Sequence, residues 1–448
     1  MNTRSGYRVL RLFIIVLETP LIQESTLRAS LPEMPAPRAK KPAFNRNIEA
    51  LRGLAALLVV VGHIIQYHDV LAPGFFSPKL ASLALSGHLS VLIFFILSGF
   101  VIGLNHPERL NANGTRVYIK KRFVRIMPIF WMSIIVAVWV AANDYPFKTI
   151  LSNAALFSVP RADVLFENNP LWSLHYEVVC YLLFIPVSYL RLNPVLVVVI
   201  SSLVGLANFL LTPYIHMPLL TAYAYGFAFW ACGLIIARYF RKEVTVEPVR
   251  LIGLIFLIMS LPAFNVLHTV LTKVLSTLRL ASDFPDSVDW YQRAIPVGDF
   301  AFLPFCFLTV LLFAGKDFRY RKTITTLLLL IPALTFVYLI GEPAARTNLR
   351  YLTCGVSYLI SCFLILGNPF VLRPFANKTL HVATWLGSIS YGLYIIHFPV
   401  LIVLGRFNLF SGTMTAYLWR ASIAIALSVG VAFVLEKKFQ PGVRKWLR

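Results

Sequence analysis

The sequence predicts an all-α protein that crosses a membrane many times. Hydrophobic residues make up 58% of its 448 residues and charged residues only 13%, about half the charged share of a soluble domain. The apolar residues gather in many separate runs of about 17 residues or more, which is the length that an α-helix needs to span a bilayer. A transmembrane β-barrel is excluded, because its strands would read as short segments of alternating apolar and polar residues.

The formal net charge of +22 does not indicate a nucleic-acid partner. The lysines and arginines lie in short clusters between the apolar runs, where they orient helices and meet anionic membrane lipids. The cysteines are odd in number and form no C-x-x-C pair, so we predict neither disulfides nor a metal site and interpret them as small packing residues. They are Cys180, Cys232, Cys306, Cys354 and Cys362.

The chain divides into a peripheral start, one membrane domain and a short end. Residues 1–45 are predicted to be a disordered cytoplasmic segment, because Ser30–Phe44 holds four prolines and the apolar stretch Leu12–Leu17 is too short to span. Residues 46–440 are predicted to form the integral-membrane domain, with no internal repeat of the kind many transporters carry. Residues 441–448 are predicted to be a short basic cytoplasmic tail.

The membrane domain holds twelve apolar runs. They lie near 51–69, 87–104, 124–142, 172–190, 193–212, 219–238, 249–271, 298–314, 323–341, 351–368, 384–404 and 415–435. The run 298–314 is short, and 193–212 follows its predecessor through only Arg191 and Leu192, so the predicted number of spans is ten to twelve. Basic clusters occur in alternate segments between these runs. The positive-inside rule therefore predicts that both termini are in the cytoplasm.

The stretch 47–64 opens the first span and carries two ionisable side chains, Arg52 and His63. They are eleven residues apart, three turns plus about 20°, so both lie on one face of the helix. The rise between them is roughly 16 Å, so if Arg52 is at one membrane surface, His63 is near the midplane. His63 is either a general base toward a hydroxyl or a packing histidine. Arg52 needs an anion, which could be a protein carboxylate or a ligand phosphate.

Two further stretches follow. Ser98 and Gly99 are small residues that permit close approach of another helix or of a ligand. Lys121 and Arg125 are one turn apart and Arg122 is turned about 100° from Lys121, so a wide basic surface faces the cytosol. That surface could hold the phosphates of a nucleotide-like ligand, or it could serve only topology and lipid contact.

The remaining polar stretches lie within later spans. Glu177 sits inside the fourth apolar run, where a carboxylate must be paired or protonated; it could bond Arg52, orient His63 or hold an acceptor hydroxyl. Another span carries a stripe of hydroxyl and imidazole groups at three- and four-residue spacings. The stripe consists of Ser390, Tyr391, Tyr394 and His397. Glu436, at the end of the last span, could pair with a cytoplasmic basic residue.

Taken in order, these stretches resemble the membrane acyltransferase-3 family, which acylates sugars and other glycan or small-molecule acceptors. The match covers residues 47 to about 440 and rests on five motifs. They are Arg52-x10-His63, Phe94–Gly99, Arg122–Pro128, Trp172–Glu177 and Gly387–Pro399. The resemblance implies a ten-helix acyltransferase core, and the region between Tyr239 and Trp385 holds two more apolar runs than that pattern needs.

The resemblance also implies roles for particular residues. His63 matches the catalytic histidine, with Arg52 as its motif partner, and Glu177 matches the acid of its motif. Arg122 and Arg125 match the family's cytoplasmic arginines, and with Lys121 and Ser98 they are expected to bind the donor. Acyl-CoA, usually acetyl-CoA, is the expected co-substrate, with no bound cofactor and no metal. The residues expected to line the acceptor cavity are Trp172, Ser173, Tyr391, Tyr394 and His397.

The implied function is an O-acetyltransferase of a bacterial cytoplasmic (inner) membrane, acting on a sugar, a glycan or a lipid-linked saccharide. Transfer could be direct or pass through an acyl-imidazole, and the acceptor could be an O-antigen, an exopolysaccharide, a nodulation-type oligosaccharide or a small secreted compound. Some relatives carry a C-terminal SGNH-type hydrolase domain; here any second catalytic step would require another protein, such as a separate periplasmic acyltransferase. The rival interpretations are a transporter or flippase of a sugar or glycolipid, and a structural or sensory membrane protein.

Overall fold

The computed structural model describes residues 45–83, 86–142, 144–211, 217–277, 292, 294–407 and 410–446. The predicted segment 1–45 therefore lies outside the described residues, except for Asn45. The described chain is helical, and its single strand-like feature is an isolated bridge between Glu243 and Lys316. Nine of the described helices are long and apolar enough to cross a membrane, or ten if one bent pair forms a single span. The predicted all-α polytopic fold is confirmed.

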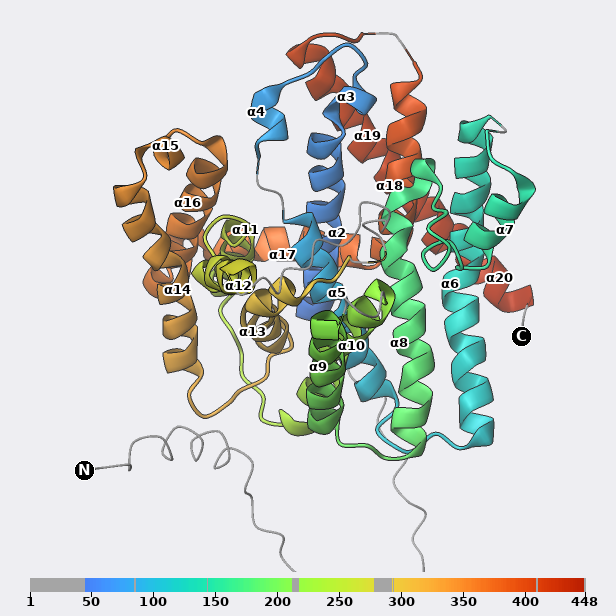
Figure 1. The fold of residues 1–448 in the computed structure, drawn as a ribbon, viewed down its shortest axis with the longest axis horizontal. Helices are drawn as coiled ribbons and strands as arrows, with labels where there is room; N and C mark the ends of the chain where they lie inside the picture. The colour runs from blue at the N-terminus through green and yellow to red at the C-terminus, as the bar shows by residue number, and fades with distance from the viewer. Residues whose placement is uncertain are drawn as a thin grey trace, which may run out of the picture. The chain divides into compact units, whose positions relative to one another are not determined.

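Figure 1 shows the order of the described helices along the chain. The first half contains α2 Arg46–Gln66, α3 His68–Leu71, α4 Pro78–Ala81, α5 Gly87–Asn105, α6 Ala112–Ala141, α7 Phe147–Ala154, η1 Phe166–Leu171, α8 Trp172–Tyr189, α9 Pro194–Leu211 and α10 Pro218–Tyr239. The second half contains α11 Pro248–Ser260, α12 Val266–Thr277, η3 Val297–Phe302, α13 Leu303–Phe313, α14 Arg321–Gly341, α15 Pro343–Arg346, α16 Leu349–Cys362, η4 Phe363–Gly367, η5 Phe370–Leu372, α17 Arg373–Gly387, α18 Ser390–Gly405, α19 Met414–Val434, η6 Leu435–Phe439 and α20 Gln440–Trp446.

Most predicted spans agree with these helices, and the exceptions have local causes. The run 249–271 is not one span: α11 ends at Ser260 and α12 begins at Val266, because Pro262 lacks the N–H that would continue the helix. The run 298–314 begins as a 3-10 turn and leaves α13 only 11 residues long. Because of these two segments, the described residues form nine long apolar helices, or ten with the bent pair, against the predicted ten to twelve.

Two other boundaries bear on the site. Helix α6 begins at Ala112, twelve residues before the predicted span, because the Asn111 side chain accepts a hydrogen bond from the N–H of Gly114 and caps it. The basic side chains that precede the apolar part of α6 are therefore held on a rigid helix. The predicted span 384–404 is broken, because α17 ends at Gly387 and α18 starts at Ser390 after a bend of 77°.

Helix α17 lies across the first half of α2, as Figure 1 shows. The crossing depends on two glycines: a Cβ on Gly53 would lie 2.1 Å from the carbonyl oxygen of Ala383, and one on Gly387 would lie 1.9 Å from that of Glu49. A second glycine crossing joins α5 to α10, where a Cβ on Gly99 would lie 1.9 Å from the carbonyl oxygen of Trp230. The expected close helix approach at Gly99 is confirmed. These crossings hold α2 and α5, which are two of the helices that line the site.

The Gly53 crossing yields a stability prediction. Because its neighbours are backbone atoms that cannot rotate away, Gly53→Ala is expected to destabilise the protein by about 1–3 kcal/mol. Gly430→Ala in α19 is the matched control, because nothing lies within 4 Å of the added Cβ, and alanine in a helix interior is favoured over glycine. Thermal unfolding in detergent compares the two; a Gly53→Ala variant as stable as the control would contradict the close crossing.

Candidate functional site

Three cavities follow one another between helices α2, α5, α6, α8 and α18. The first, here called the basic cavity, has a volume of about 700 Å³ and is lined by basic residues of α2 and α6 together with Ser98, Glu177, Tyr181 and Tyr391. The second, the neck, has a volume of about 80 Å³. The third, the histidine cavity, has a volume of about 450 Å³ and includes His63.

The cavities share walls. The neck shares Arg52, Phe94, Glu177 and Tyr391 with the basic cavity. It shares Val91 and Tyr394 with the histidine cavity. Arg52 and His63 thus lie on the side of α2 that faces this series of cavities, as their spacing predicted, but Arg52 lines the basic cavity and the neck while His63 lines the histidine cavity.

His63 is held by a second histidine. Its Nδ1 lies 2.8 Å from Nε2 of His397, and Nδ1 of His397 lies 2.7 Å from the carbonyl oxygen of Tyr394. A carbonyl oxygen can only accept, so His397 carries its proton on Nδ1 and its Nε2 accepts from Nδ1–H of His63. The lone pair of neutral His63 is therefore on Nε2, the nitrogen left for the cavity. His397, expected in the lining, is instead buried behind His63 with 2% of its surface exposed.

Tyr394 separates the neck from the histidine cavity. Its hydroxyl lies 2.6 Å from Oγ of Ser173 and donates to the carbonyl oxygen of Pro170 at 2.8 Å. Because one hydroxyl has one proton, Ser173 is the donor in the first of these bonds. Ser173 lines the neck and Tyr394 lines both cavities. The Ser173–Tyr394 pair forms the wall between the two.

The histidine cavity has polar walls that the sequence reasoning missed. They include Gln66, Tyr67, His88 and Asn169, beside the predicted Trp172. The buried Oδ1 of Asn169 has no hydrogen-bond partner among the described residues, although its amide nitrogen donates to the hydroxyl of Tyr67 at 3.2 Å. Gln66 and Tyr67 are one helical turn beyond His63 and so lie on the same face of the helix. This spacing could have identified them as residues that line the same cavity.

His88 is a second imidazole in the histidine cavity. Its Nε2 lies 2.8 Å from Oδ2 of Asp299, whose side chain is 4% exposed, and its ring stacks on Trp172 with centroids 6.3 Å apart. A histidine oriented by a carboxylate can move protons or hold a hydroxyl. His88 and Asp299 are 211 residues apart, so no sequence spacing could have linked them.

Glu177 lies beside Arg52 in the neck and the basic cavity. Its Oε1 accepts from the hydroxyl of Tyr181 at 2.5 Å, and that hydroxyl accepts from Ser98 at 2.9 Å. Arg52 pairs with Glu49 at 3.1 Å. Of the three expected roles for Glu177, neither a bond to Arg52 nor one to His63 occurs among the described residues. Ser98, which was expected to bind the acyl donor, donates a hydrogen bond to Tyr181 in this network and so orients it.

The basic cavity contains the predicted Lys121, Arg122 and Arg125. Arg125 forms an ion pair with Glu436 at 2.5 Å, which confirms the expected pairing of Glu436. Arg122 differs: its buried Nε has no hydrogen-bond partner among the described residues, and its guanidinium carbon lies 5.7 Å from the centre of the Tyr181 ring. A buried guanidinium donor without an acceptor leaves one hydrogen bond of Arg122 unmade, and an anion is the acceptor that such a donor bonds most strongly.

Within the described ranges, no group of three or more His, Cys, Asp and Glu side chains is placed to hold a metal ion. A family model described as an acyltransferase domain matches residues 45–437, which is most of the chain. No curated protein and no solved structure shows significant similarity to the sequence. The matched range contains every residue that lines the neck and the histidine cavity.

Proposed function

The chain belongs to the acyltransferase-3 family of membrane acyltransferases, and we propose that it moves an acyl group, in the first place acetyl, from acyl-CoA to a hydroxyl of a sugar or glycan. The observation that carries this proposal is the series of adjacent cavities that lies between a basic surface and a histidine. Coenzyme A has phosphates at one end and a thioester at the end of a thin arm. The cavities match that order: a wide basic cavity, a narrow neck and then His63.

The donor would enter from the basic end of the helices, and the excess of positive charge there supports a cytosolic position for that end. Its phosphates would meet Arg122, whose Nε lacks a partner, together with Lys121 and Arg52. A neck of about 80 Å³ has room for a flexible chain but not for the nucleotide. The thioester would therefore reach Tyr394 while the charged part of the donor stays behind.

The acceptor would bind in the histidine cavity. Trp172 offers an aromatic face, and the free Oδ1 of Asn169 offers an acceptor for a hydroxyl. His88, held by Asp299, offers a further polar contact. A wall with one aromatic ring and several fixed hydrogen-bonding groups suits a sugar, since its hydroxyls satisfy polar groups that would otherwise be buried without partners.

In the direct reaction, Nε2 of His63 takes the proton of the acceptor hydroxyl as the oxygen attacks the thioester carbonyl. The carbon–sulfur bond then breaks, and the imidazolium returns the proton to the leaving thiolate. His397 supports this cycle by accepting from Nδ1–H of His63, which keeps Nε2 as the basic nitrogen. In the alternative route, Nε2 itself takes the acyl group. An acyl-enzyme trapped with donor alone would favour that route.

The proposed donor site yields a prediction for Arg122. Arg122→Ala is expected to raise KM for acyl-CoA by about 10- to 100-fold with a smaller change in kcat, because a charge-assisted hydrogen bond contributes about 1.5–3 kcal/mol. Arg116→Ala is the matched control, since Arg116 lies on the same helix but does not line the basic cavity. Steady-state kinetics with purified protein measures both. An unchanged KM in Arg122→Ala would place the phosphates elsewhere.

The function itself is tested by comparing surface glycans from cells with and without the protein by mass spectrometry. A mass difference of one acyl group supports the proposal and reports the acceptor. The competing transporter or flippase is tested in proteoliposomes: saccharide uptake without consumption of acyl-CoA would favour it. The polar residues around His63 are compatible with an acyltransferase and with a transporter. Consumption of acyl-CoA is therefore the measurement that decides between the two.

A further inference from the structure

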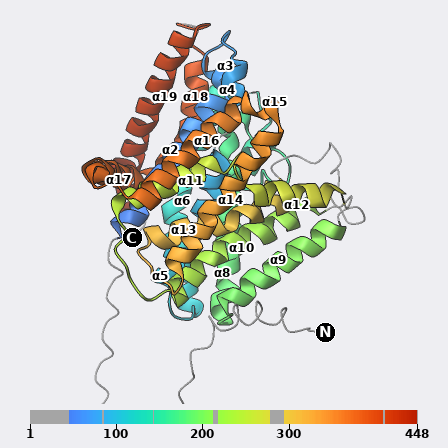
Figure 2. The ribbon, with the colours of Figure 1, turned by 90° about the vertical axis from the view of Figure 1, so that its left-hand side faces the viewer.

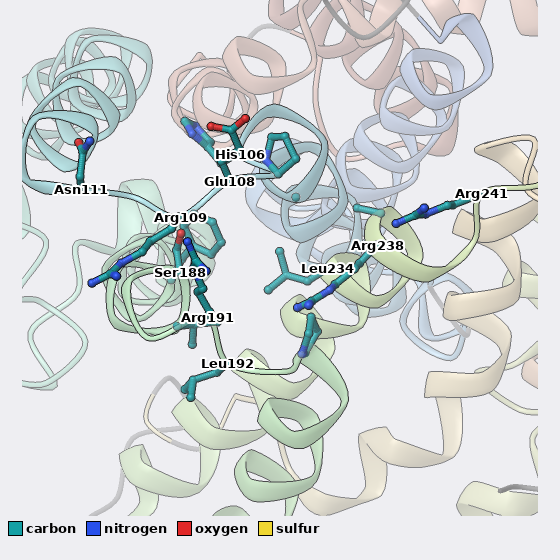
Figure 3. A pocket seen from close by; sticks show the side chains of 16 residues that line it. His106, Glu108, Arg109, Asn111, Ser188, Arg191, Leu192, Leu234, Arg238 and Arg241 are labelled. Carbon is teal, nitrogen blue, oxygen red and sulfur yellow. The ribbon is translucent and has the colours of Figure 1, made fainter. Parts of the chain in front are cut away.

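A second basic hollow lies at one end of the helix bundle. Its lining includes Arg191, Arg238 and Arg241 (Figure 3). It has a volume of about 740 Å³ and is formed by the ends of α5, α8, α9 and α10. We call it the arginine hollow. It shares no lining residue with the basic cavity, so the proposed donor path does not account for it.

Arg191 occupies a backbone position that normally belongs to glycine. Its φ is +54°, and it follows the last turn of α8. Its N–H donates to the carbonyl of Ser188 at 3.2 Å, while the N–H of Leu192 donates to that of Val187 at 3.0 Å. This is the Schellman ending of a helix, in which glycine is favoured because a Cβ is unfavourable in the left-handed region. The arginine side chain is present here at a conformational cost.

Among the residues that the structure describes, the arginines of the hollow lack acidic partners. None of Arg191, Arg238 and Arg241 forms an ion pair with an acidic residue in the described part of the chain. Figure 3 shows Arg238 and Arg241 extending from α10 and the chain after it toward the side where Arg191 lies. Glu108 is the one acidic residue in the lining. The hollow thus offers several guanidinium groups to an anion.

Part of the lining of the hollow is apolar. Its apolar side chains include Phe184, Val187 and Leu234. The neighbouring α9 lies along α10 (Figure 2) and presents exposed apolar side chains, among them Leu196, Ile200 and Leu203, with 50–59% of their surface exposed. Such a surface faces lipid. The hollow therefore borders the bilayer at the level of the headgroups.

From these four observations we propose that the arginine hollow binds the phosphate-bearing headgroup of an anionic phospholipid, with the start of an acyl chain against Phe184 and Leu234. A phosphodiester can accept from several guanidinium groups at once, and basic pockets between helix ends on the cytoplasmic side suit such headgroups. The proposal also explains why an arginine occupies a left-handed position that favours glycine: the guanidinium of Arg191 would bind the headgroup. The proposal depends on the membrane fold and not on the proposed acyl transfer.

The test uses the full chain in a mild detergent, analysed by native mass spectrometry with phosphatidylglycerol or phosphatidylcholine of the same chain length. The wild-type protein is expected to retain phosphatidylglycerol preferentially. Arg191→Gly and Arg238→Gln are each expected to weaken that retention by about fivefold, from the usual contribution of one arginine near an anionic surface. Arg191→Gly is also expected to melt at the same or a higher temperature, because glycine suits the left-handed position.

Arg116→Gln is the control, because Arg116 is an exposed arginine on α6 that does not line the hollow. It should leave phosphatidylglycerol retention unchanged. Equal retention in wild type, Arg191→Gly and Arg238→Gln would overturn the proposal. Displacement of the lipid by inorganic phosphate would also overturn the proposal, because the hollow would then bind a soluble phosphate. Displacement by coenzyme A at micromolar concentration would overturn it too, because the hollow would then bind the acyl donor.

Discussion

Replacing His63 by alanine is expected to lower the rate of acyl transfer by about 10²- to 10⁴-fold, the usual contribution of a general base. The structure gives the reason: His63 lines the cavity proposed for the acceptor, and its Nδ1 is engaged with His397, so Nε2 is the group that can take a proton. The variant should still fold, because the removed ring is partly exposed and borders a cavity. The measurement is release of free CoA by purified protein with donor and acceptor present.

The second imidazole of the histidine cavity provides the control for this experiment. His88→Ala removes a ring oriented by Asp299, and under the proposed mechanism it should weaken acceptor binding more than the chemical step. KM for the acceptor should therefore rise, with a smaller effect on kcat. The opposite result, normal turnover in His63→Ala and a large loss of kcat in His88→Ala, would move the role of base to His88.

Replacing His397 by leucine is expected to lower kcat by about 10- to 10²-fold while KM for both substrates stays nearly constant. Leucine cannot accept the hydrogen bond from His63, so the imidazole loses the interaction that fixes its tautomer and its orientation. His397 is therefore a positioning residue: it lines none of the three cavities but sets which nitrogen of His63 is basic. Steady-state kinetics with each substrate varied in turn separates the two parameters.

A conservative variant distinguishes positioning from a merely structural role. His397→Gln offers a side-chain oxygen that can accept from His63, so it should recover part of the lost kcat. A structural role alone would make both variants equally unstable and would lower the amount of active protein without changing the kcat of what remains. Equal kcat values in His397→Leu and wild-type protein would show that the bond between the histidines does not matter for catalysis.

The sequence allowed the helical periods and the local contacts to be predicted. The spacing of Arg52 and His63 on one face of a helix follows from 3.6 residues per turn, and the small residue Gly99 does mark a close crossing. Pro262 was present to be read as a helix end, but the long apolar run around it outweighed that signal. The bend before Ser390 was harder to predict, because Gly387 and Ser388 occur in straight membrane helices as well.

The site was predictable only where its parts are near one another in sequence. The bond between His63 and His397 joins residues 334 positions apart, and the pair of His88 and Asp299 joins two elements on either side of the middle of the chain. Hydropathy gives no indication of such pairs, because each partner sits among apolar neighbours and is satisfied only by the folded structure. The division of Arg52 and His63 between two cavities depends in the same way on side chains from α5, α8 and α18.

The wall formed by Ser173 and Tyr394 bears on the electrical properties of the membrane. A resting voltage acts on any charge that crosses it, at about 2.3 kcal/mol per elementary charge for each 100 mV. If the phosphates stop at Arg122 and only an uncharged acyl group passes the tyrosine, a transfer event moves no net charge through the voltage drop. The rate of acyl transfer would then be the same in energised and de-energised cells. Transfer of the acyl group would also leave the ion gradients across the membrane unchanged.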